Sequence, residues 1–413
     1  AGKIAILQGV TYPNPNRSHF RGTDIWLTET DAEVFESTGW IGRYLETQYP
    51  TYPDVLPADP MAVQIGSTVS LGFQSDKGNL AVTFRSPEEF YALVGQSATP
   101  LWPEAPDTPA GHELEFIRII AEDSQLYSAR VKEAADAGNN IGTYPDTDLA
   151  ASLKVVANLI SGGLSTKFYL VSIPGNAFDT HNNQGGVTGN HAALLEEVSG
   201  AIKAFMDDLE ALGHADRVAG MTFSEFGRRV EANGSNGTDH GTAAPLFVFG
   251  KNVIGNRIHG NDPDLQNLDE RGDLLMQHDY RQIYASTLAQ WFSTPENEIQ
   301  QLLYGDFTTL PLFKMPSSSV GDEANAAAPV LMQNYPNPVS GTTIIEYALP
   351  ATAYVTLSIL DVRGNVITRL VSGEQQAGKH SIPFSTTGLA AGAYFYKLEV
   401  GRFSTVKQMR IVR

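Results

Sequence analysis

The strongest constraint on the fold is a change of residue pattern near residue 329. Beyond that point apolar and polar residues alternate, as in the run that contains Val355, Leu357 and Ile359. A period of two residues indicates a β-strand with one buried face, because successive side chains point to opposite sides of a sheet. Glycine-containing turns separate these runs. Residues 329–413 are therefore predicted to form a small antiparallel, immunoglobulin-like sandwich.

The segment before this change is predicted to be a linker. Residues 316–328 have the sequence PSSSVGDEANAAA, which is small, polar and without an apolar face. Such a composition is typical of flexible spacers. We therefore expect a body, residues 1–315, a linker, residues 316–328, and a C-terminal domain, residues 329–413. The length of 413 residues suits two domains.

The body alternates apolar runs of strand length with amphipathic helices. In the helix predicted around residues 195–209, apolar residues recur at steps of three and four, and a last helix is predicted at 280–291. The order strand–helix–strand predicts an α/β fold, in which a mostly parallel sheet is sandwiched by helices. Residues 50–150 are less periodic and are predicted to form a cap inserted over the sheet. The predicted strands are residues 3–10, 167–173, 217–223 and 245–249.

Charge and composition exclude several classes of protein. Residues 1–328 hold 20 of the 28 Lys and Arg residues and 42 of the 46 Asp and Glu residues, a net charge of −22. An acidic body repels nucleic acids and anionic lipids, so no nucleic-acid partner is expected. No run of 18 apolar residues is present, so no transmembrane segment is predicted. Because the chain has no Cys, its strong metal ligands must be His, Asp or Glu.

Polar clusters adjoin the predicted strands of the body. Ligands of open α/β sheets bind beyond the carboxyl ends of the strands, so these clusters are expected at one edge of the sheet. Imidazole and carboxylate groups hold divalent cations such as Zn²⁺, Mn²⁺ or Ca²⁺, and an open coordination position takes water or a substrate oxygen. We therefore predict a divalent-metal site. Its candidate ligands are Asp179, His181, Glu225, Asp239, His240 and His259.

The C-terminal domain contains four recognisable segments: Asn334-Tyr335-Pro336-Asn337-Pro338, the turn Asp361-Val362-Arg363-Gly364, residues 392–398 and residues 407–413. Through them it resembles the C-terminal sorting domain of proteins that the type IX secretion system exports. The resemblance implies that residues 329–413 bind the secretion machinery. It also implies that the protein is secreted or held at the outer cell surface.

Five segments of the body together resemble a second family. They are QGVTYPNPNRSHFRGTDIW, GWIGRYL, FDTHNNQ, TFSEFGRRVEANGSNGTDHGTAAPLFVFG and GDLLMQHDYRQIYASTLAQWF. Residues 4–291 thereby resemble a bacterial family known as domain of unknown function 1501, allied in sequence to sulfatases, alkaline phosphatases and cofactor-independent phosphoglycerate mutases. The resemblance implies an alkaline-phosphatase-like fold. It also implies that the family's first strand, with its metal-binding Asp, precedes Ala1.

The resemblance implies a role for three residues before the first predicted helix. Ser18 would be the nucleophile that attacks phosphorus or sulfur, with Arg17 or His19 near the leaving anion. A helix N-terminus suits this task, because its free N–H groups stabilise negative charge. The alternative is that Ser18 only caps the helix that begins at His19.

Two assignments of the metal ligands follow from the resemblance. In the first, Asp179 and His181 bind one metal and His240 is the late metal-binding His of the superfamily. Glu225 then stands where the superfamily carries an Asp-His pair.

In the second assignment, Asp239 and His240 form that pair, His259 is the late His, and Glu225 is structural. Either way the protein is expected to be a metal-dependent hydrolase of phosphate or sulfate esters, with a small-molecule or glycan substrate. The alternative is a non-catalytic surface or binding protein that keeps the fold with an incomplete metal site.

Overall fold

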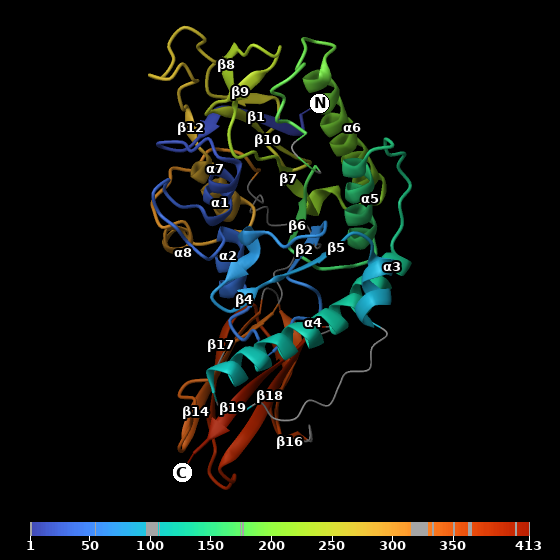
Figure 1. Cartoon of the computed structure of the whole chain (residues 1–413). Coiled ribbons are helices and arrows are strands. Elements are labelled where there is room, and N and C mark those ends of the chain that lie inside the picture. Colours follow the sequence, from blue (N-terminus) through green and yellow to red (C-terminus); the bar gives the residue numbers. More distant parts are fainter. Residues whose placement is uncertain are drawn as a thin grey trace. The chain divides into compact units, whose positions relative to one another are not determined.

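The computed structural model describes residues 2–53, 55–95, 106, 108–173, 175, 177–314, 329–332, 334–349, 352–361, 366–400 and 403–412 (Figure 1). The chain divides into two compact units, Ala1–Pro316 and Ser317–Arg413. The predicted linker, residues 316–328, and the turn residues 362–364 lie outside the described residues.

The first unit contains helices and short strands in mixed order. The helices are α1 (His19–Thr28), α2 (Trp40–Gln48), α3 (Pro87–Phe90), α4 (Pro109–Ala137), α5 (Asp148–Ser161), α6 (Asn190–Ala211), α7 (Tyr280–Gln290) and α8 (Glu296–Leu302). The strands are β1 (Ile4–Thr11), β2 (Ala62–Ile65), β3 (Gln74–Ser75), β4 (Gly78–Asn79), β5 (Ala81–Phe84), β6 (Phe168–Val171), β7 (Ala219–Met221), β8 (Arg228–Ala232), β9 (Thr238–His240), β10 (Ala244–Gly250), β11 (Arg257–His259) and β12 (His278–Asp279).

One sheet of the first unit mixes parallel and antiparallel pairs. Its order is β11-β1-β10-β7, and β12 also pairs with β1. Strands β11 and β12 run parallel to β1, whereas β10 runs antiparallel to both β1 and β7. This corrects the prediction of a single, mostly parallel sheet. Apolar periodicity reports which residues are buried, and the direction of a partner strand depends on contacts far apart in the sequence.

A second sheet is wholly parallel and has the order β5-β2-β6. Its central strand, Ala62–Ile65, is buried along its whole length. Strands β2 and β5 come from residues 50–150, so this part of the predicted cap belongs to a sheet of the body. The strand was missed because both of its faces are covered. A short strand buried on both faces lacks the alternation of apolar and polar residues.

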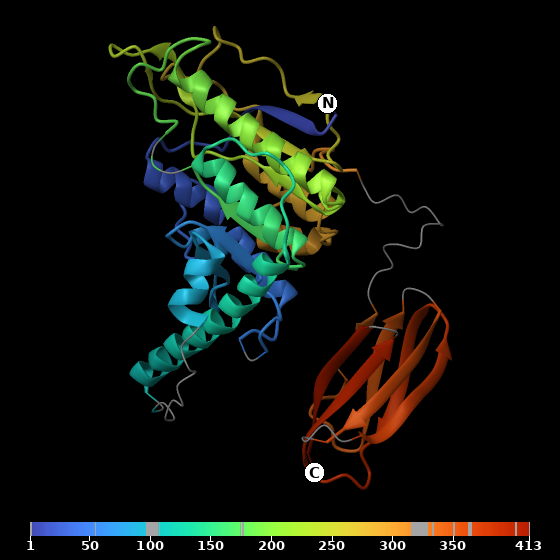
Figure 2. The same cartoon turned by 90° about the vertical axis from the view of Figure 1, so that its right-hand side faces the viewer.

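Helices cover both faces of these sheets (Figures 1 and 2). In β6, Phe168 and Leu170 pack against one apolar cluster, which includes residues of α1, α2 and α7. Tyr169 and Val171 pack against a second cluster, which includes residues of α5 and α6. Successive side chains of a strand point to opposite faces, so β6 joins the two cores. The first unit is therefore a three-layer α/β structure.

Two helices of the first unit lie where the periodicity predicted them. Of the apolar residues at 195–209, Phe205 and Leu209 are buried in the core on the inner side of α6, whereas Leu195 is 44% exposed. The helix predicted at 280–291 is α7, and the helix α8 follows it before the end of the unit. Among the described residues no helix is long and apolar enough to cross a lipid bilayer.

The described strands of the second unit pair with one another antiparallel. One sheet has the order β13-β14-β17 and the other β16-β15-β18-β19. The alternating residues Val355, Leu357 and Ile359 are completely buried between them. The strands are β13 (Val330–Leu331), β14 (Thr342–Leu349), β15 (Ala353–Leu360), β16 (Val366–Gln375), β17 (Gly378–Ser385), β18 (Gly392–Val400) and β19 (Phe403–Ile411).

A buried polar contact fixes the start of this second unit. The backbone N–H of Asn334 donates a hydrogen bond to the Tyr396 hydroxyl at 2.7 Å, and that hydroxyl donates to the Met332 carbonyl at 2.9 Å. The Asn334 side chain donates to Thr343 Oγ1 at 2.9 Å and to the Pro336 carbonyl at 3.1 Å. The Asn-Tyr-Pro-Asn-Pro segment is thus tied to the core strands by its first residue.

Candidate metal centre

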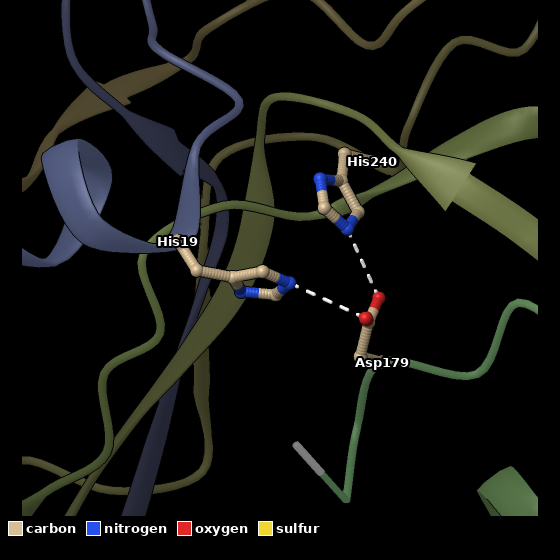
Figure 3. Close-up of side chains that lie close together, drawn as sticks. All are labelled: His19, Asp179 and His240. Atoms are coloured by element: carbon tan, nitrogen blue, oxygen red, sulfur yellow. Dashed lines mark hydrogen bonds and ion pairs between the residues drawn. The ribbon is translucent and has the colours of Figure 1, made fainter.

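Three side chains from distant parts of the sequence converge at one point of the first unit (Figure 3). His19 is the first residue of α1, Asp179 lies in the loop between β6 and α6, and His240 ends β9. His240 Nε2 lies 3.0 Å from Asp179 Oδ1, and His19 Nε2 lies 3.3 Å from Asp179 Oδ2. Each of the three contributes one donor atom within 4.8 Å of the others.

A fourth side chain, His181, contacts two of these three residues. Its Nε2 lies 3.0 Å from Asp179 Oδ1 and 3.1 Å from His240 Nε2. The His181 side chain is 38% exposed, whereas those of the other three are between 17% and 29% exposed. We call His19, Asp179, His181 and His240 the histidine cluster. Three side chains of the cluster are thus mostly buried, and His181 is the one that is most accessible to solvent.

The second nitrogen of each imidazole is held by an oxygen. His19 Nδ1 lies 2.6 Å from Glu225 Oε1, and His181 Nδ1 lies 2.9 Å from Asp239 Oδ1. His240 Nδ1 donates to the backbone carbonyl of Arg17 at 2.8 Å. Carboxylate and carbonyl oxygens only accept hydrogen bonds, so all three Nδ1 atoms carry the proton. Each Nε2 faces the Asp179 carboxylate, which also only accepts hydrogen bonds, so a proton or a metal ion lies between them.

The centre of the cluster is a place for a cation. His181 Nε2 and His240 Nε2 lie 3.1 Å apart, and both face the Asp179 carboxylate. Acceptors at such distances repel unless a proton or a metal ion lies between them. Oxygen partners on the outer nitrogens of metal-binding histidines are the usual second layer of a metal site.

Charged neighbours shift the pKa values within the cluster. Burial raises the pKa of Asp179, but hydrogen bonds from Arg228 and His240 outweigh burial and leave the pKa lowered. Burial lowers the pKa of His19, but hydrogen bonds to Glu225 and Asp179 outweigh this and leave the pKa raised. Asp179 is therefore ionised at neutral pH, as a metal ligand must be.

Arg228 belongs to the site, although the sequence did not single it out. It is the first residue of β8 and pairs with His240 across the β8–β9 hairpin. Its Nη1 donates to Asp179 Oδ1 at 2.5 Å, and its Nη2 donates to the Thr238 carbonyl. The signal available was its place in the polar cluster of residues 224–229. Nothing in that run distinguished Arg228 from Arg229, because the strand direction decides which of them faces Asp179.

The predicted nucleophile and its neighbour have different surroundings from the cluster. Ser18 is the N-cap residue of α1, yet its side chain makes no capping hydrogen bond, and it is exposed. The guanidinium group of Arg17 donates to the buried carboxylate of Asp273. Arg17 thus supports His240 through its carbonyl, while its charge is directed to Asp273.

Three of the predicted metal ligands, Glu225, Asp239 and His259, lie outside the histidine cluster. Glu225 and Asp239 lie behind His19 and His181 and contact their Nδ1 atoms. His259 lies in β11 beside Leu7 of β1, and in the described part of the chain its Nε2 has no hydrogen-bond partner. It is not among the residues that converge with Asp179. His19, predicted to lie near a leaving anion, takes its place in the cluster.

Two family models match separate parts of the chain. Residues 159–303 match the family described as "Protein of unknown function (DUF1501)". Residues 333–412 match "Secretion system C-terminal sorting domain". Residues 333–412 are a type IX secretion sorting domain. The protein is therefore secreted or attached at the outer cell surface, and this domain interacts with the secretion machinery.

The DUF1501 match includes most of the histidine cluster. It spans β6 to α8 and so contains Asp179, His181 and His240, whereas His19 precedes it. Neither family description names an activity, and no curated protein matches the chain. The relationship of the first unit to sulfatases and alkaline phosphatases remains a prediction.

Two solved structures show only distant similarity. Dimeric latent PorU from Porphyromonas gingivalis is 19% identical over 21% of this chain, with a TM-score of 0.18, and the match covers 10% of that protein's chain. The crystal structure of an engineered protein is 13% identical over 83% of this chain and 67% of its own, with a TM-score of 0.18. These scores are too low to assign a fold.

Proposed function

We propose that the protein is a metal-dependent hydrolase of phosphate or sulfate esters that acts outside the cell or at its outer surface. The observation that carries this proposal is the convergence of three Nε2 atoms on Asp179, each imidazole being held from behind by an oxygen. Histidines positioned in this way are oriented for a metal ion before it binds.

The donor atoms of the cluster favour particular metals. The donor atoms that lie within 4.8 Å of one another are the imidazole nitrogens of His19 and His240 and a carboxylate oxygen of Asp179, a set that suits Zn²⁺, and Mn²⁺ is a weaker fit. Ca²⁺ prefers six to eight oxygen ligands, so the cluster disfavours it. When bound, a divalent cation supplies positive charge that polarises an ester oxygen. Arg228, which contacts Asp179, adds a second positive charge beside this place.

An alkaline-phosphatase-like arrangement is part of the proposal. The support is a three-layer body whose candidate site gathers residues from loops and strand ends, as in other α/β sheets. In this protein the arrangement would include one antiparallel strand, β10, between β1 and β7. A fold alone does not define chemistry, so the proposal rests on the histidine cluster.

Ser18 is the proposed nucleophile. One feature of its surroundings supports this role, and another favours the alternative, a protein without turnover. It directly precedes His19, and its exposed hydroxyl is accessible to an ester. Attack on phosphorus or sulfur requires that the hydroxyl lose its proton. In the described part of the chain no side chain hydrogen-bonds to that hydroxyl. This observation favours a protein that binds metal without turnover.

Metal titration and ester hydrolysis test both readings together. We expect the wild-type protein to bind about one Zn²⁺ in calorimetry and to hydrolyse p-nitrophenyl phosphate or p-nitrophenyl sulfate only with metal. His240→Ala should lower the Zn²⁺ affinity at least about 10-fold. The matched control is His214→Ala, since His214 lies in the turn after α6.

The outcomes separate the two readings. Zn²⁺ binding that depends on His240, with hydrolysis of neither ester, would support the non-catalytic protein. Absence of Zn²⁺ and Mn²⁺ binding would contradict the metal centre itself. Equal effects of His240→Ala and His214→Ala would place the ion elsewhere.

A further inference from the structure

One positively charged side chain contacts an oxygen atom at the centre of the histidine cluster. Arg228 Nη1 donates to Asp179 Oδ1 at 2.5 Å. The same oxygen lies 3.0 Å from His240 Nε2 and 3.0 Å from His181 Nε2. A metal ion that bound to these histidines and to Asp179 Oδ1 would therefore share this oxygen with the guanidinium group of Arg228.

The other partners of the cluster differ from Arg228 in charge and in the atom that they contact. Glu225 and Asp239 carry negative charge, and they contact the Nδ1 atoms of His19 and His181. A carboxylate at Nδ1 makes the opposite ring nitrogen a stronger metal ligand. Arg228 carries positive charge and donates to the carboxylate oxygen itself, which reduces the negative charge available to a cation. Glu225 and Asp239 thus favour a metal ion, and Arg228 opposes it.

The guanidinium group of Arg228 is fixed in this place. The side chain of Arg228 is 14% exposed and that of Asp179 is 17% exposed, so water screens their charges less than it screens those of surface groups. Arg228 Nη2 donates to the Thr238 carbonyl, and Nε donates to Thr238 Oγ1 at 3.3 Å. Thr238 and His240 both belong to β9, so one strand positions a candidate metal ligand and the arginine beside it.

The charges in contact with the cluster leave room for one divalent cation while Arg228 stays in place. Asp179, Glu225 and Asp239 are negative, and Arg228 is positive. Metal binding requires neutral imidazoles, and these four groups then leave two negative charges. Without Arg228 three negative charges would attract the ion. Arg228 therefore lowers the affinity for a metal ion without abolishing it.

We propose that Arg228 pairs with the Asp179 carboxylate in the metal-free protein and competes with the metal ion for it. Arg228 thereby sets the metal affinity of the centre below the value that the histidine cluster alone would give. The centre then fills only at a higher concentration of free metal and releases its ion more readily. The inference rests on the proposed function for the presence of a metal ion, but it requires no ester hydrolysis.

Calorimetric titration of the full-length protein with Zn²⁺ tests this competition. Arg228→Gln should bind Zn²⁺ at least about 10-fold more tightly than the wild type, because a charged hydrogen bond to the ligand oxygen is removed. Arg228→Met is a second variant without charge that keeps a long side chain, and it should show the same gain. Arg228→Lys keeps the positive charge, so its Zn²⁺ affinity should stay closer to that of the wild type.

Arg229→Gln is the matched control. It removes the same charge one residue further along β8, where the guanidinium contacts Asp273 instead of Asp179. Its Zn²⁺ affinity should be nearly that of the wild type. Thermal unfolding gives a second measurement. At one Zn²⁺ concentration the metal should raise the melting temperature of Arg228→Gln more than that of the wild type, because a tighter ligand stabilises the folded state more.

Three results would overturn the inference. The first is Zn²⁺ binding by Arg228→Gln and Arg228→Met that is no tighter than in the wild type, since Arg228 would then support the ligand. The second is an equal gain in Arg229→Gln, which would show a general effect of net charge. The third is Arg228→Lys binding Zn²⁺ as tightly as Arg228→Gln, because the charge would then not be the cause.

The same titrations separate this inference from the proposed function. Tighter Zn²⁺ binding by Arg228→Gln in a protein that hydrolyses no ester supports the competition and contradicts the hydrolase. Metal-dependent hydrolysis by the wild type, with weaker Zn²⁺ binding by Arg228→Gln, contradicts the competition and supports the hydrolase. Absence of Zn²⁺ binding in the wild type and in every variant would overturn both.

Discussion

The orientation of each histidine in the cluster depends on the oxygen atom that its Nδ1 contacts. His19 and His181 are held by the carboxylates of Glu225 and Asp239, and His240 is held by a backbone carbonyl. The outer hydrogen bonds fix the proton on Nδ1 and direct Nε2 to Asp179. The residues that contact the Nδ1 atoms are therefore as important for recognising the metal site as the candidate ligands themselves.

Removal of an outer partner should weaken metal binding without loss of the fold. Glu225→Ala takes away the acceptor of His19 Nδ1 and leaves that ring free to rotate or to change its proton position. We expect the Zn²⁺ affinity to fall about 10-fold to 100-fold. Glu231→Ala is the control, because Glu231 is an exposed carboxylate on β8. A titration in which the two variants bind Zn²⁺ equally well would refute the supporting role of Glu225.

Ser18 provides a second prediction at the scale of a residue. Because its side chain makes no capping hydrogen bond, Ser18→Ala should leave the melting temperature nearly unchanged. Thr147→Ala is the comparison, since Thr147 Oγ1 accepts the N–H of Ala150 at the start of α5, and its loss should cost about 1 kcal/mol.

Ester hydrolysis per folded molecule then decides the role of Ser18. A nucleophile predicts that Ser18→Ala reduces turnover by several orders of magnitude. If thermal unfolding showed the same loss for both variants, Ser18 would be a structural cap after all.

At the scale of elements, one buried carboxylate fixes the position of α6. Asp208 is completely buried and accepts hydrogen bonds from Asn140 Nδ2 at 2.8 Å, from the N–H groups of Ile141 and Gly142 at 2.9 and 2.8 Å, and from the Tyr144 hydroxyl at 3.0 Å. Helix α6 is thereby joined to the segment that connects α4 and α5. No sequence period signals this contact, because an Asp on an amphipathic helix is usually exposed.

The free energy of unfolding should depend on Asp208 and on pH. Asp208→Asn replaces a charged acceptor, and we expect a loss of about 2–3 kcal/mol at pH 7. Burial raises the pKa of Asp208, but the hydrogen bonds from Asn140, Ile141 and Gly142 outweigh it, so the pKa is lowered. A lowered carboxyl pKa adds stability above the unfolded value of about 3.9, and this is lost as the pH falls through the folded value.

Urea unfolding of both proteins at several pH values measures this effect. The difference between wild type and Asp208→Asn should shrink as the pH falls below about 4, because the carboxyl of the unfolded wild type binds a proton there and that of the folded protein does so only at lower pH. A difference that stays constant down to pH 3 would show that the carboxylate charge is not what stabilises the contact.

At the scale of the whole molecule, the two units have separate apolar cores. The core of the second unit includes Tyr347, Leu357 and Tyr396 and contains residues of that unit alone. Apolar cores that share no residues can unfold in separate transitions. The sorting domain is thus expected to be an independent folding unit with its own role in export.

Residues 329–413 expressed alone should show one cooperative thermal transition with a β-rich circular dichroism spectrum. Tyr396→Phe should lower its stability by about 1–3 kcal/mol, because the buried N–H of Asn334 then loses its acceptor. Tyr354→Phe is the control, since the Tyr354 hydroxyl is exposed. A fragment without a cooperative transition would contradict the boundary at residue 329.

The sequence by itself determined the features that depend on residues close together along the chain. The alternation around Val355 and Leu357 predicted the sandwich, and the spacing of three and four predicted α6. Position after a predicted strand identified Asp179 and His181 as candidate ligands, and position just before one identified His240. Each of these inferences uses residues within about one turn or one strand of each other, where periodicity reports burial directly.

Only the tertiary structure decided which residues meet. His19 and Glu225 are 206 residues apart, and Arg17 and His240 are 223 residues apart, so no local pattern links them. The antiparallel direction of β10 and the place of β2 within a sheet likewise depend on partners distant in the sequence. Arg228 faces Asp179, and His259 lies apart from the cluster, because strand pairing, rather than residue type, directs each side chain.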